Sequence, residues 1–257
     1  MSSYKERFEF AKEMIITSGQ YLLSLKADRK KVEVKQKNDF VTLADKENEA
    51  FIISQIKEKF PQDGIFGEES GKSEDSLTGR WVIDPIDGTV NFMHGFPDYT
   101  ISIAFEDEKG VLTFGLVYCP EQKELFSAFK GEGATLNGQA IQVSQSKDFS
   151  RELGLCVYPH RRREALDLYQ TRQRRILDKI SDLRSVGSAA LSLCYVASAR
   201  CVLYYEMFLG WYDIAAGIII LEEAGGKVTM DREGDYPIHI AASSALIHDT
   251  LLEAIND

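Results

Sequence analysis

The amino-acid sequence predicts a mixed fold, in which an α+β half over residues 1–147 is followed by an α/β half over residues 148–257. Two observations lead to this prediction. Short β-branched and aromatic runs separated by turn residues occupy residues 64–143, whereas strand and helix patterns alternate after about residue 150. Because no proline-rich or low-complexity linker separates the halves, we expect them to share a tight interface.

Two helices and a sheet are expected in the first half. Apolar residues recur with a 3.6-residue period over residues 4–26, which predicts an amphipathic helix. A second helix is expected over residues 45–60, where Pro61 ends it. Turn pairs such as Asn137-Gly138 separate the β-type runs of residues 64–143, so we expect an antiparallel sheet there.

The second half alternates between the two element types. The predicted strands are Leu153–Tyr158, Leu183–Val186, Cys201–Glu206 and His239–Ala242. The predicted helices cover residues 161–181, 188–200 and 213–224, and a last helix ends the chain. A serine cap opens the second of these helices, and a Gly-Gly pair ends the third.

The composition is that of a globular protein with an acidic excess. Of 257 residues, 44% are apolar, and 40 Asp and Glu against 30 Lys and Arg give a net charge of −10. This charge argues against a nucleic-acid or anionic-membrane binder that works by bulk charge. The charged N-terminus is unlike a signal peptide and no apolar run is long enough for a membrane span, so we expect a cytoplasmic protein with reduced cysteines.

Acidic residues recur in three turn contexts, at residues 67–70, 81–92 and 211–217. In the middle segment an apolar strand delivers Asp84, and Pro85 turns the chain. Asp87 then lies in the same tight turn. Two such carboxylates repel each other unless a cation lies between them. All-oxygen ligands favour a hard ion, Mg²⁺ first, with Mn²⁺ or Ca²⁺ as alternatives.

The residues after this pair suit an anion. Gly88 allows close approach of the backbone, and the N–H groups near Thr89 could face a phosphate at a helix start. The alternative interpretation of the whole segment is a strand end with a capping aspartate.

Other phosphate and nucleotide motifs are excluded by their spacing. Gly71-Lys72-Ser73 lacks the earlier glycine of a P-loop, because Phe66 occupies that position. The D-x-x-D-G-T spacing of residues 84–89 is one residue longer than the D-x-D-G-T motif of haloacid-dehalogenase-type phosphatases, which use an aspartyl nucleophile. No G-x-S-x-G elbow is present.

At its three acidic segments the sequence resembles the inositol monophosphatase family, within the lithium-sensitive, Mg²⁺-dependent phosphatases that include fructose-1,6-bisphosphatases. Residues 67–70 match G-E-E-[ST], and residues 81–92 match W-x-I-D-P-[IL]-D-G-T-x-N-F. The third motif, W-D-x-A-[AG]-G, is altered, since Tyr212 replaces the usual Trp while Asp213 is retained. The resemblance spans roughly residues 4–256.

The resemblance implies the metal ligands. One ion would be held by Glu68, Asp84 and the carbonyl of Ile86. A second would be held by Asp84, Asp87 and Asp213, and a third, weaker ion by Glu68 and waters. The implied cofactor is Mg²⁺, as two or three ions, for which Mn²⁺ substitutes while Ca²⁺ and Li⁺ inhibit.

It also implies the groups around the substrate. Thr89, oriented by Asp45, would help Glu68 and the metals to activate the attacking water. The remaining substrate contacts would be Asp87, Gly88, Thr89, Gly187, Ser188, Ala189 and Glu206. Further family matches include Glu69 and Lys35.

The implied protein is a layered αβαβα homodimer. Its implied reaction is hydrolysis of a small phosphorylated metabolite by direct attack of metal-activated water, with inositol monophosphate as first substrate. NADP(H) 2′-phosphate, fructose 1,6-bisphosphate and 3′-phosphoadenosine 5′-phosphate remain alternative substrates. A regulatory, protein-binding homologue is the non-enzymatic alternative; neither a nucleic-acid nor a membrane partner is expected.

Basic residues cluster between Arg161 and Lys179 on one predicted helix. They are Arg161, Arg162, Arg163, Arg172, Arg174, Arg175 and Lys179. A solvated helix face is one interpretation. The other is recognition of a second anionic group on the substrate.

Overall fold

The computed structural model describes residues 3–29, 32–36, 39–73, 78–232 and 234–256. Its α-helices are α1 (Ser3–Ser24), α2 (Leu43–Lys59), α3 (Thr89–His94), α4 (Leu166–Leu177), α5 (Ala189–Ala197), α6 (Trp211–Glu223) and α7 (His248–Ile255). Its strands are β1 (Val32–Gln36), β2 (Asp39–Thr42), β3 (Gly64–Gly67), β4 (Gly71–Lys72), β5 (Arg80–Asp87), β6 (Thr100–Glu106), β7 (Leu112–Cys119), β8 (Glu124–Phe129), β9 (Ala134–Leu136), β10 (Gln139–Ile141), β11 (Leu153–Cys156), β12 (Asp182–Arg184), β13 (Leu203–Leu209), β14 (Gly226–Arg232) and β15 (Ile238–Ser244).

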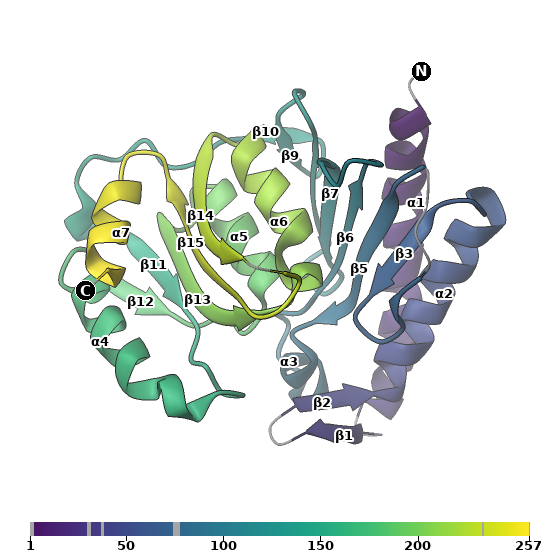
Figure 1. The fold of residues 1–257 in the computed structure, drawn as a ribbon, viewed down its shortest axis with the longest axis horizontal. Helices are drawn as coiled ribbons and strands as arrows, with labels where there is room; N and C mark the ends of the chain where they lie inside the picture. Colours follow the sequence, from purple (N-terminus) through teal and green to yellow (C-terminus); the bar gives the residue numbers. More distant parts are fainter. Residues whose placement is uncertain (1–2, 30–31, 37–38, 74–77, 233, 257) are drawn as a thin grey trace.

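These elements stack in five layers (Figure 1). Helices α1 and α2 cover one face of an eight-stranded sheet of order β10-β9-β8-β7-β6-β5-β3-β4. Helices α5 and α6 lie between this sheet and a five-stranded sheet of order β12-β11-β13-β15-β14. Helices α4 and α7 form the outermost layer beyond the second sheet (Figure 1). The layered sandwich implied by the family resemblance is therefore confirmed.

The first sheet differs from the prediction in one pairing. Strand β3 runs parallel to β5, although the remaining pairings of this sheet are antiparallel. The sheet is therefore mixed, because the chain leaves β3, forms the short β4 beyond it and returns to start β5 beside β3. All strands of this sheet precede residue 142 and those of the second sheet follow residue 152, while the division into domains at residues 147 and 148 stays a prediction.

The predicted helix over residues 161–181 is too long. Residues 159–165 form successive turns instead, with Arg162 N–H donating to the Pro159 carbonyl and Ala165 N–H to the Arg162 carbonyl. Helix α4 begins only at Leu166 and ends at Leu177. Pro159 favours a turn, and the residue before α4 is Ala165, which supplies no side-chain cap. The basic residues from Arg161 to Arg163 therefore lie outside this helix.

Strands β14, β1 and β2 were not predicted. Strand β14 pairs antiparallel with β15 along its full length, at the edge of the second sheet. Its sequence, GKVTMDR, carries three charged residues, so its apolar alternation is weak. Among the described residues, no helix is long and apolar enough to span a membrane.

The core lies between the layers in three clusters of buried apolar side chains. The cluster beneath α1 and α2 is aromatic and centres on Trp81, which is fully buried. The Trp81 ring packs edge-on against Phe105 and Phe114, at centroid distances of 5.2 and 5.6 Å. This packing fixes β5, the strand that leads into Asp84 and Asp87.

A buried ion pair ties α1 to the start of β3. Arg7 donates from both Nε and a terminal nitrogen to the Asp63 carboxylate, at 2.7 Å each. Asp63 also accepts hydrogen bonds from the Trp81 indole at 2.9 Å and from the Thr78 hydroxyl at 2.8 Å. Its two oxygens thereby accept from four donor atoms of three residues, which offsets part of the cost of burying the charge.

Removing this carboxylate should therefore destabilise the protein strongly. We expect Asp63→Ala to lower the free energy of unfolding by about 3–5 kcal/mol, because it leaves the Arg7 charge buried without its partner. Urea unfolding followed by circular dichroism measures the change. The control is Arg151→Ala, which breaks an exposed ion pair with Asp148 and should cost less than ~0.5 kcal/mol. Equal losses in the two variants would contradict the assignment.

Candidate active site

The end of strand β5 carries two of the site's aspartates, Asp84 and Asp87. Its pairing with β6 carries Asp84 opposite Ser102 and Asp87 opposite Thr100, so β5 contains an irregularity between them. Pro85 has no N–H to give to the ladder, and the Ile86 N–H turns back to Asp84 Oδ1 at 3.0 Å. Asp84 and Asp87 are 1% and 7% exposed.

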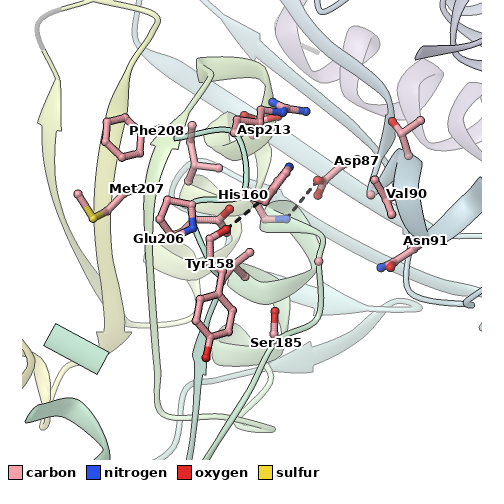
Figure 2. A pocket seen from close by; sticks show the side chains of 18 of the residues that line it. Asp87, Val90, Asn91, Tyr158, His160, Ser185, Glu206, Met207, Phe208 and Asp213 are labelled. Carbon is pink, nitrogen blue, oxygen red and sulfur yellow. Dashed lines mark hydrogen bonds between the residues drawn. The ribbon is translucent and has the colours of Figure 1, made fainter. Parts of the chain in front are cut away.

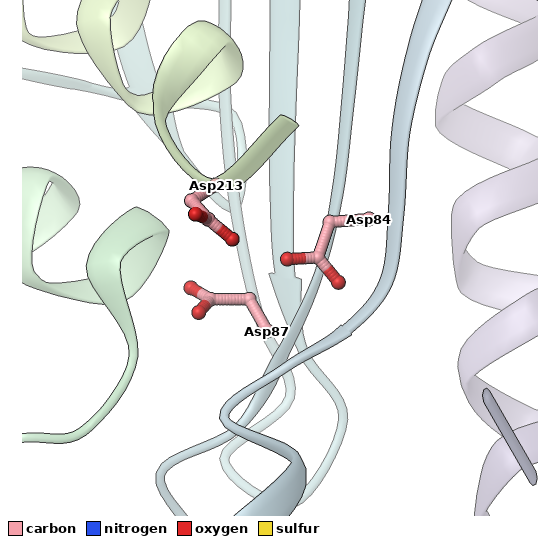
Figure 3. A group of neighbouring side chains, drawn as sticks. All are labelled: Asp84, Asp87 and Asp213. Carbon is pink, nitrogen blue, oxygen red and sulfur yellow. The ribbon is translucent and has the colours of Figure 1, made fainter. Parts of the chain in front are cut away.

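Helix α6 brings a third aspartate to the same place. Gly210 is its N-cap, and Asp213, in the first turn, accepts a hydrogen bond from the Gly210 N–H at 2.6 Å. Asp84, Asp87 and Asp213 each offer a carboxylate oxygen, and these oxygens lie within 4.8 Å of one another (Figure 3). We call these three residues the aspartate cluster.

The aspartate cluster is electrostatically strained. Burial, together with Glu68, Asp87 and Asp213, raises the pKa of Asp84 well above its usual value. Burial and Asp213 raise the pKa of Asp87 to about 7, although hydrogen bonds from α5 oppose that rise. Carboxylates that are buried and repel one another fit a divalent cation, and the all-oxygen donor set fits a hard one.

Helix α5 holds Asp87 from behind. The Ser188 hydroxyl donates to Asp87 Oδ2 at 2.6 Å, the Ala190 N–H to Oδ2 at 2.7 Å and the Ala189 N–H to Oδ1 at 3.1 Å. Ser188 also caps α5 by accepting from the Leu191 N–H at 3.2 Å. Ser188 thus supports Asp87 and is not among the residues that line the pocket, whereas Gly187 and Ala189 are, and its role as a substrate contact stays a prediction.

Helix α2 positions the predicted water-activating pair. Asp45 forms a capping box with Thr42 at the start of α2 and is completely buried. Its Oδ1 lies 3.0 Å from the Thr89 hydroxyl, which also lies 3.1 Å from the Ile86 carbonyl. Gly88 precedes Thr89 with a φ of 96°, a left-handed conformation that glycine adopts at no steric cost.

Two further residues of α2 were missed by the sequence reasoning. Glu49, 2% exposed, accepts the N–H groups of Glu69 and Ser70 at 3.0 and 2.7 Å. The Asn48 amide donates to the Pro85 carbonyl at 2.9 Å. Both residues lie about one helical turn beyond Asp45, so the inward-facing period of α2 was the signal available in the sequence.

Glu68 and Glu206 complete the acidic side of the pocket. Glu68 follows β3 and is anchored by its N–H to the Ile83 carbonyl at 3.1 Å. Glu206, in β13, receives a hydrogen bond from the Tyr204 hydroxyl. Burial raises the pKa of Glu206 to about 8, with Asp213 and Asp87 adding to the rise and Arg161 opposing it. Lys35 lies in β1, whose side chains are outside the part of the chain that the structure describes.

The altered third motif is accommodated by packing. The Tyr212 ring meets Phe66 edge-on at 5.8 Å, and its backbone carbonyl lies 3.4 Å from the Ser102 hydroxyl. A β-carbon on Gly210 would come within 2.6 Å of the Tyr212 ring, so a larger residue there would force the ring to shift. Asp213 keeps its place in the aspartate cluster despite the change.

The aspartate cluster lines a cavity of about 440 Å³ (Figure 2). Its volume lies in the range of ~300–1,000 Å³ that is usual for pockets that bind small molecules. The cavity brings together Glu68, Asp84, Ile86, Asp87, Gly88, Thr89, Gly187, Ala189, Glu206 and Asp213 from the sequence prediction. It also contains Arg161, Arg162 and Arg163.

Comparison with known proteins identifies relatives of this chain in one phosphatase family. The sequence profile of the inositol monophosphatase family matches residues 3–256. The chain is 36% identical to inositol monophosphatase 3 of Solanum lycopersicum, over 99% of this chain and 98% of the relative. It is 37% identical to the Nus factor SuhB of Pasteurella multocida, over 86% of this chain and 84% of that protein.

A solved structure shows the same architecture. The inositol monophosphatase of Anabaena (Nostoc) sp. PCC 7120 superposes with a TM-score of 0.86 at 34% identity, covering 99% of this chain and 96% of that one. With the family profile, the sequence relatives and the fold in agreement, the chain belongs to the inositol monophosphatase family, whose members are phosphatases that act on small phosphate substrates.

Proposed function

We propose that the chain is a Mg²⁺-dependent phosphatase that hydrolyses small phosphate monoesters, with inositol monophosphate as the first candidate substrate. The aspartate cluster carries this proposal. Three carboxylates, two of them buried and the third partly exposed, have oxygens within 4.8 Å of one another, and they are costly to hold together unless a divalent cation is bound. Oxygen-only ligands favour Mg²⁺, and Mn²⁺ is the expected substitute.

The proposed reaction assigns a separate role to each group of residues in the cavity. Asp84, Asp87 and Asp213 hold the cations, and Glu68 extends this set at the edge of the cavity. When bound, the cations lower the pKa of water to near neutrality and offset the negative charge that would otherwise repel a phosphate.

Other groups orient the reactants. The Thr89 hydroxyl donates a hydrogen bond to Asp45, which fixes the direction of the lone pairs on the Thr89 oxygen. That oxygen can then accept a hydrogen bond from the attacking water. The Gly88 and Thr89 N–H groups are the proposed donors to the phosphate oxygens, and Glu206 faces the alcohol side of the substrate. No side-chain nucleophile is needed, so we propose direct attack by water with inversion at phosphorus.

Several finer points remain part of the proposal. Inhibition by Li⁺ and Ca²⁺, assembly as a homodimer and a cytoplasmic location follow from the family resemblance or the composition. NADP(H), fructose 1,6-bisphosphate and 3′-phosphoadenosine 5′-phosphate remain alternative substrates on the same scaffold.

Loss of one cluster carboxylate should abolish activity. We expect Asp213→Asn to lower kcat/KM for phosphate release by about 10³-fold or more, which exceeds the ~10–100-fold typical of residues that only support a metal ligand. Phosphate release with and without Mg²⁺ provides the measurement. Asp178→Asn, an exposed position after α4, is the control and should retain wild-type activity. Full activity of Asp213→Asn in saturating Mg²⁺ would refute the site, and a phospho-enzyme trapped by rapid quench would refute direct attack.

The cluster should also make stability depend on the cation. Mg²⁺ in about hundredfold excess over its Kd should raise Tm by about 5–10 °C, because it binds only the folded state. Without Mg²⁺, Asp84→Asn should unfold at a higher temperature than the wild type, because it removes one of the repelling charges. Differential scanning calorimetry with EDTA or Mg²⁺ tests both statements. An Asp84→Asn variant with a lower Tm in EDTA, or with the wild-type Mg²⁺ response, would contradict them.

A further inference from the structure

A polar contact joins the two sheets outside the cavity. Where β14 ends and β15 begins, the second sheet approaches the first sheet near β4 and β5 (Figure 1). Asp235 lies between β14 and β15 in the sequence and is not among the residues that line the cavity. The proposed function gives Asp235 no role, although it contacts two segments that carry acids of the site.

The carboxylate of Asp235 pairs with cations from three strands. The Lys72 ammonium, from β4, forms an ion pair with Oδ2, and Arg232, from β14, pairs with Oδ1 at 3.0 Å. A terminal nitrogen of Arg80, from β5, lies 3.9 Å from Oδ1. The side chain of Asp235 is 20% exposed, so solvent and salt screen these pairs less than they screen pairs on an open surface.

The backbone of Asp235 holds the start of α6. A helix start leaves its first N–H groups without partners inside the helix, and the Trp211 N–H donates to the Asp235 carbonyl at 2.9 Å. The Arg232 guanidinium carbon lies 3.5 Å from the centroid of the Trp211 ring. The Trp211 indole N–H donates to Glu106 of β6 at 2.9 Å, and Glu106 also pairs with Arg80. Contacts from both sheets therefore hold Trp211.

Two acids of the site lie next to these contacts. Asp213 shares the first turn of α6 with Trp211. Glu68 lies in the turn between β3 and β4, and Lys72 follows that turn directly as part of β4. Asp235 is thus connected through Lys72 to the segment that carries Glu68, and through Trp211 to the segment that carries Asp213.

We propose that Asp235 is a positioning residue, which fixes the turn that carries Glu68 relative to the first turn of α6 and so keeps Glu68 and Asp213 at the spacing that a cation needs. This inference rests on the proposed function, because it assigns Asp235 a role in Mg²⁺ affinity. Carboxylates that repel one another move apart when the segments that carry them loosen. Loss of a group that orients a metal ligand typically lowers metal affinity by about 10–100-fold.

Positioning and bulk electrostatics predict opposite results for one substitution. Lys72→Met removes a positive charge near a site that binds cations, so charge alone would tighten Mg²⁺ binding. Positioning predicts weaker binding, because Asp235 loses its ion pair with β4. Asp235→Asn weakens binding under both explanations, so Lys72→Met decides between them.

Calorimetric titration of the full chain with Mg²⁺ measures the affinity. We expect Asp235→Asn to raise the Kd about tenfold and Lys72→Met to raise it about threefold. The double variant should bind no more weakly than Asp235→Asn alone, because both substitutions remove the same ion pair. Asp235→Glu keeps the charge and should bind Mg²⁺ more tightly than Asp235→Asn. Asp178→Asn and Lys179→Met, exposed positions after α4 in the outermost layer, are the charge-matched controls and should leave the Kd unchanged.

Hydrogen exchange in EDTA tests the same role without a cation. The amides of residues 210–216 should exchange about threefold faster in Asp235→Asn and in Lys72→Met than in the wild type, the change that one lost ion pair of ordinary strength gives. The cause is that the residues around Asp235 then hold Trp211 less firmly. Amides of α1 should exchange at the wild-type rate in both variants, which shows that the fold is intact.

The outcomes separate this inference from the function on which it rests. A Lys72→Met variant that binds Mg²⁺ as tightly as the wild type or more tightly, or unchanged exchange of residues 210–216 in both variants, would overturn the positioning role. A wild type that binds Mg²⁺ but releases no phosphate from any small monoester would overturn the proposed function, and the Kd values would still decide the positioning role. A wild type that binds no Mg²⁺ would overturn both.

Discussion

The mutual repulsion of Asp84, Asp87 and Asp213 is the constraint around which this structure is organised. Their oxygens lie within 4.8 Å of one another, and burial raises the pKa values of Asp84 and Asp87. Hydrogen bonds from neighbouring elements hold these carboxylates in position. The start of α5 supplies donors to Asp87, and the N-cap of α6 supplies one to Asp213. These bonds hold the carboxylates in place but do not supply the positive charge that would balance them.

The layered fold explains how such a cluster can be held rigidly. Asp87 ends β5, a strand fixed on one side by the aromatic core around Trp81. Asp213 lies in the first turn of α6, which is packed between the two sheets. Helix α2 supports the same site from the other side, because Asp45, Asn48 and Glu49 share its buried face. Each of these elements is stabilised by its own apolar packing. The free energy of that packing, rather than contacts within the cluster, therefore offsets the repulsion between the carboxylates.

The pocket joins two kinds of chemistry in one cavity. Carboxylates occupy the end where cations and a phosphate monoester are proposed to bind, and three consecutive arginines occupy the segment before α4. Arg161 reaches far enough to oppose the rise in the pKa of Glu206, so the two regions are electrically coupled. Under the proposed function, the acidic end would repel a phosphate unless cations were bound there, whereas the arginines carry positive charge without them.

The turn that carries Asp84 and Asp87 and the membership of the family could both be predicted from the sequence. Asp84, Pro85 and Asp87 set a turn at a strand end because proline restricts its neighbours, and Asp213 marked a helix start through its motif. Tertiary structure alone decided which acids meet, since Asp213 and Glu49 reach the site only through packing between layers. The structure also shows that Arg161 to Arg163 lie outside the predicted helix and that Phe208 lies in a bulge. Turns and helix starts are fixed by sterics between neighbours in the chain, whereas strand register and side-chain convergence depend on contacts between residues far apart in sequence.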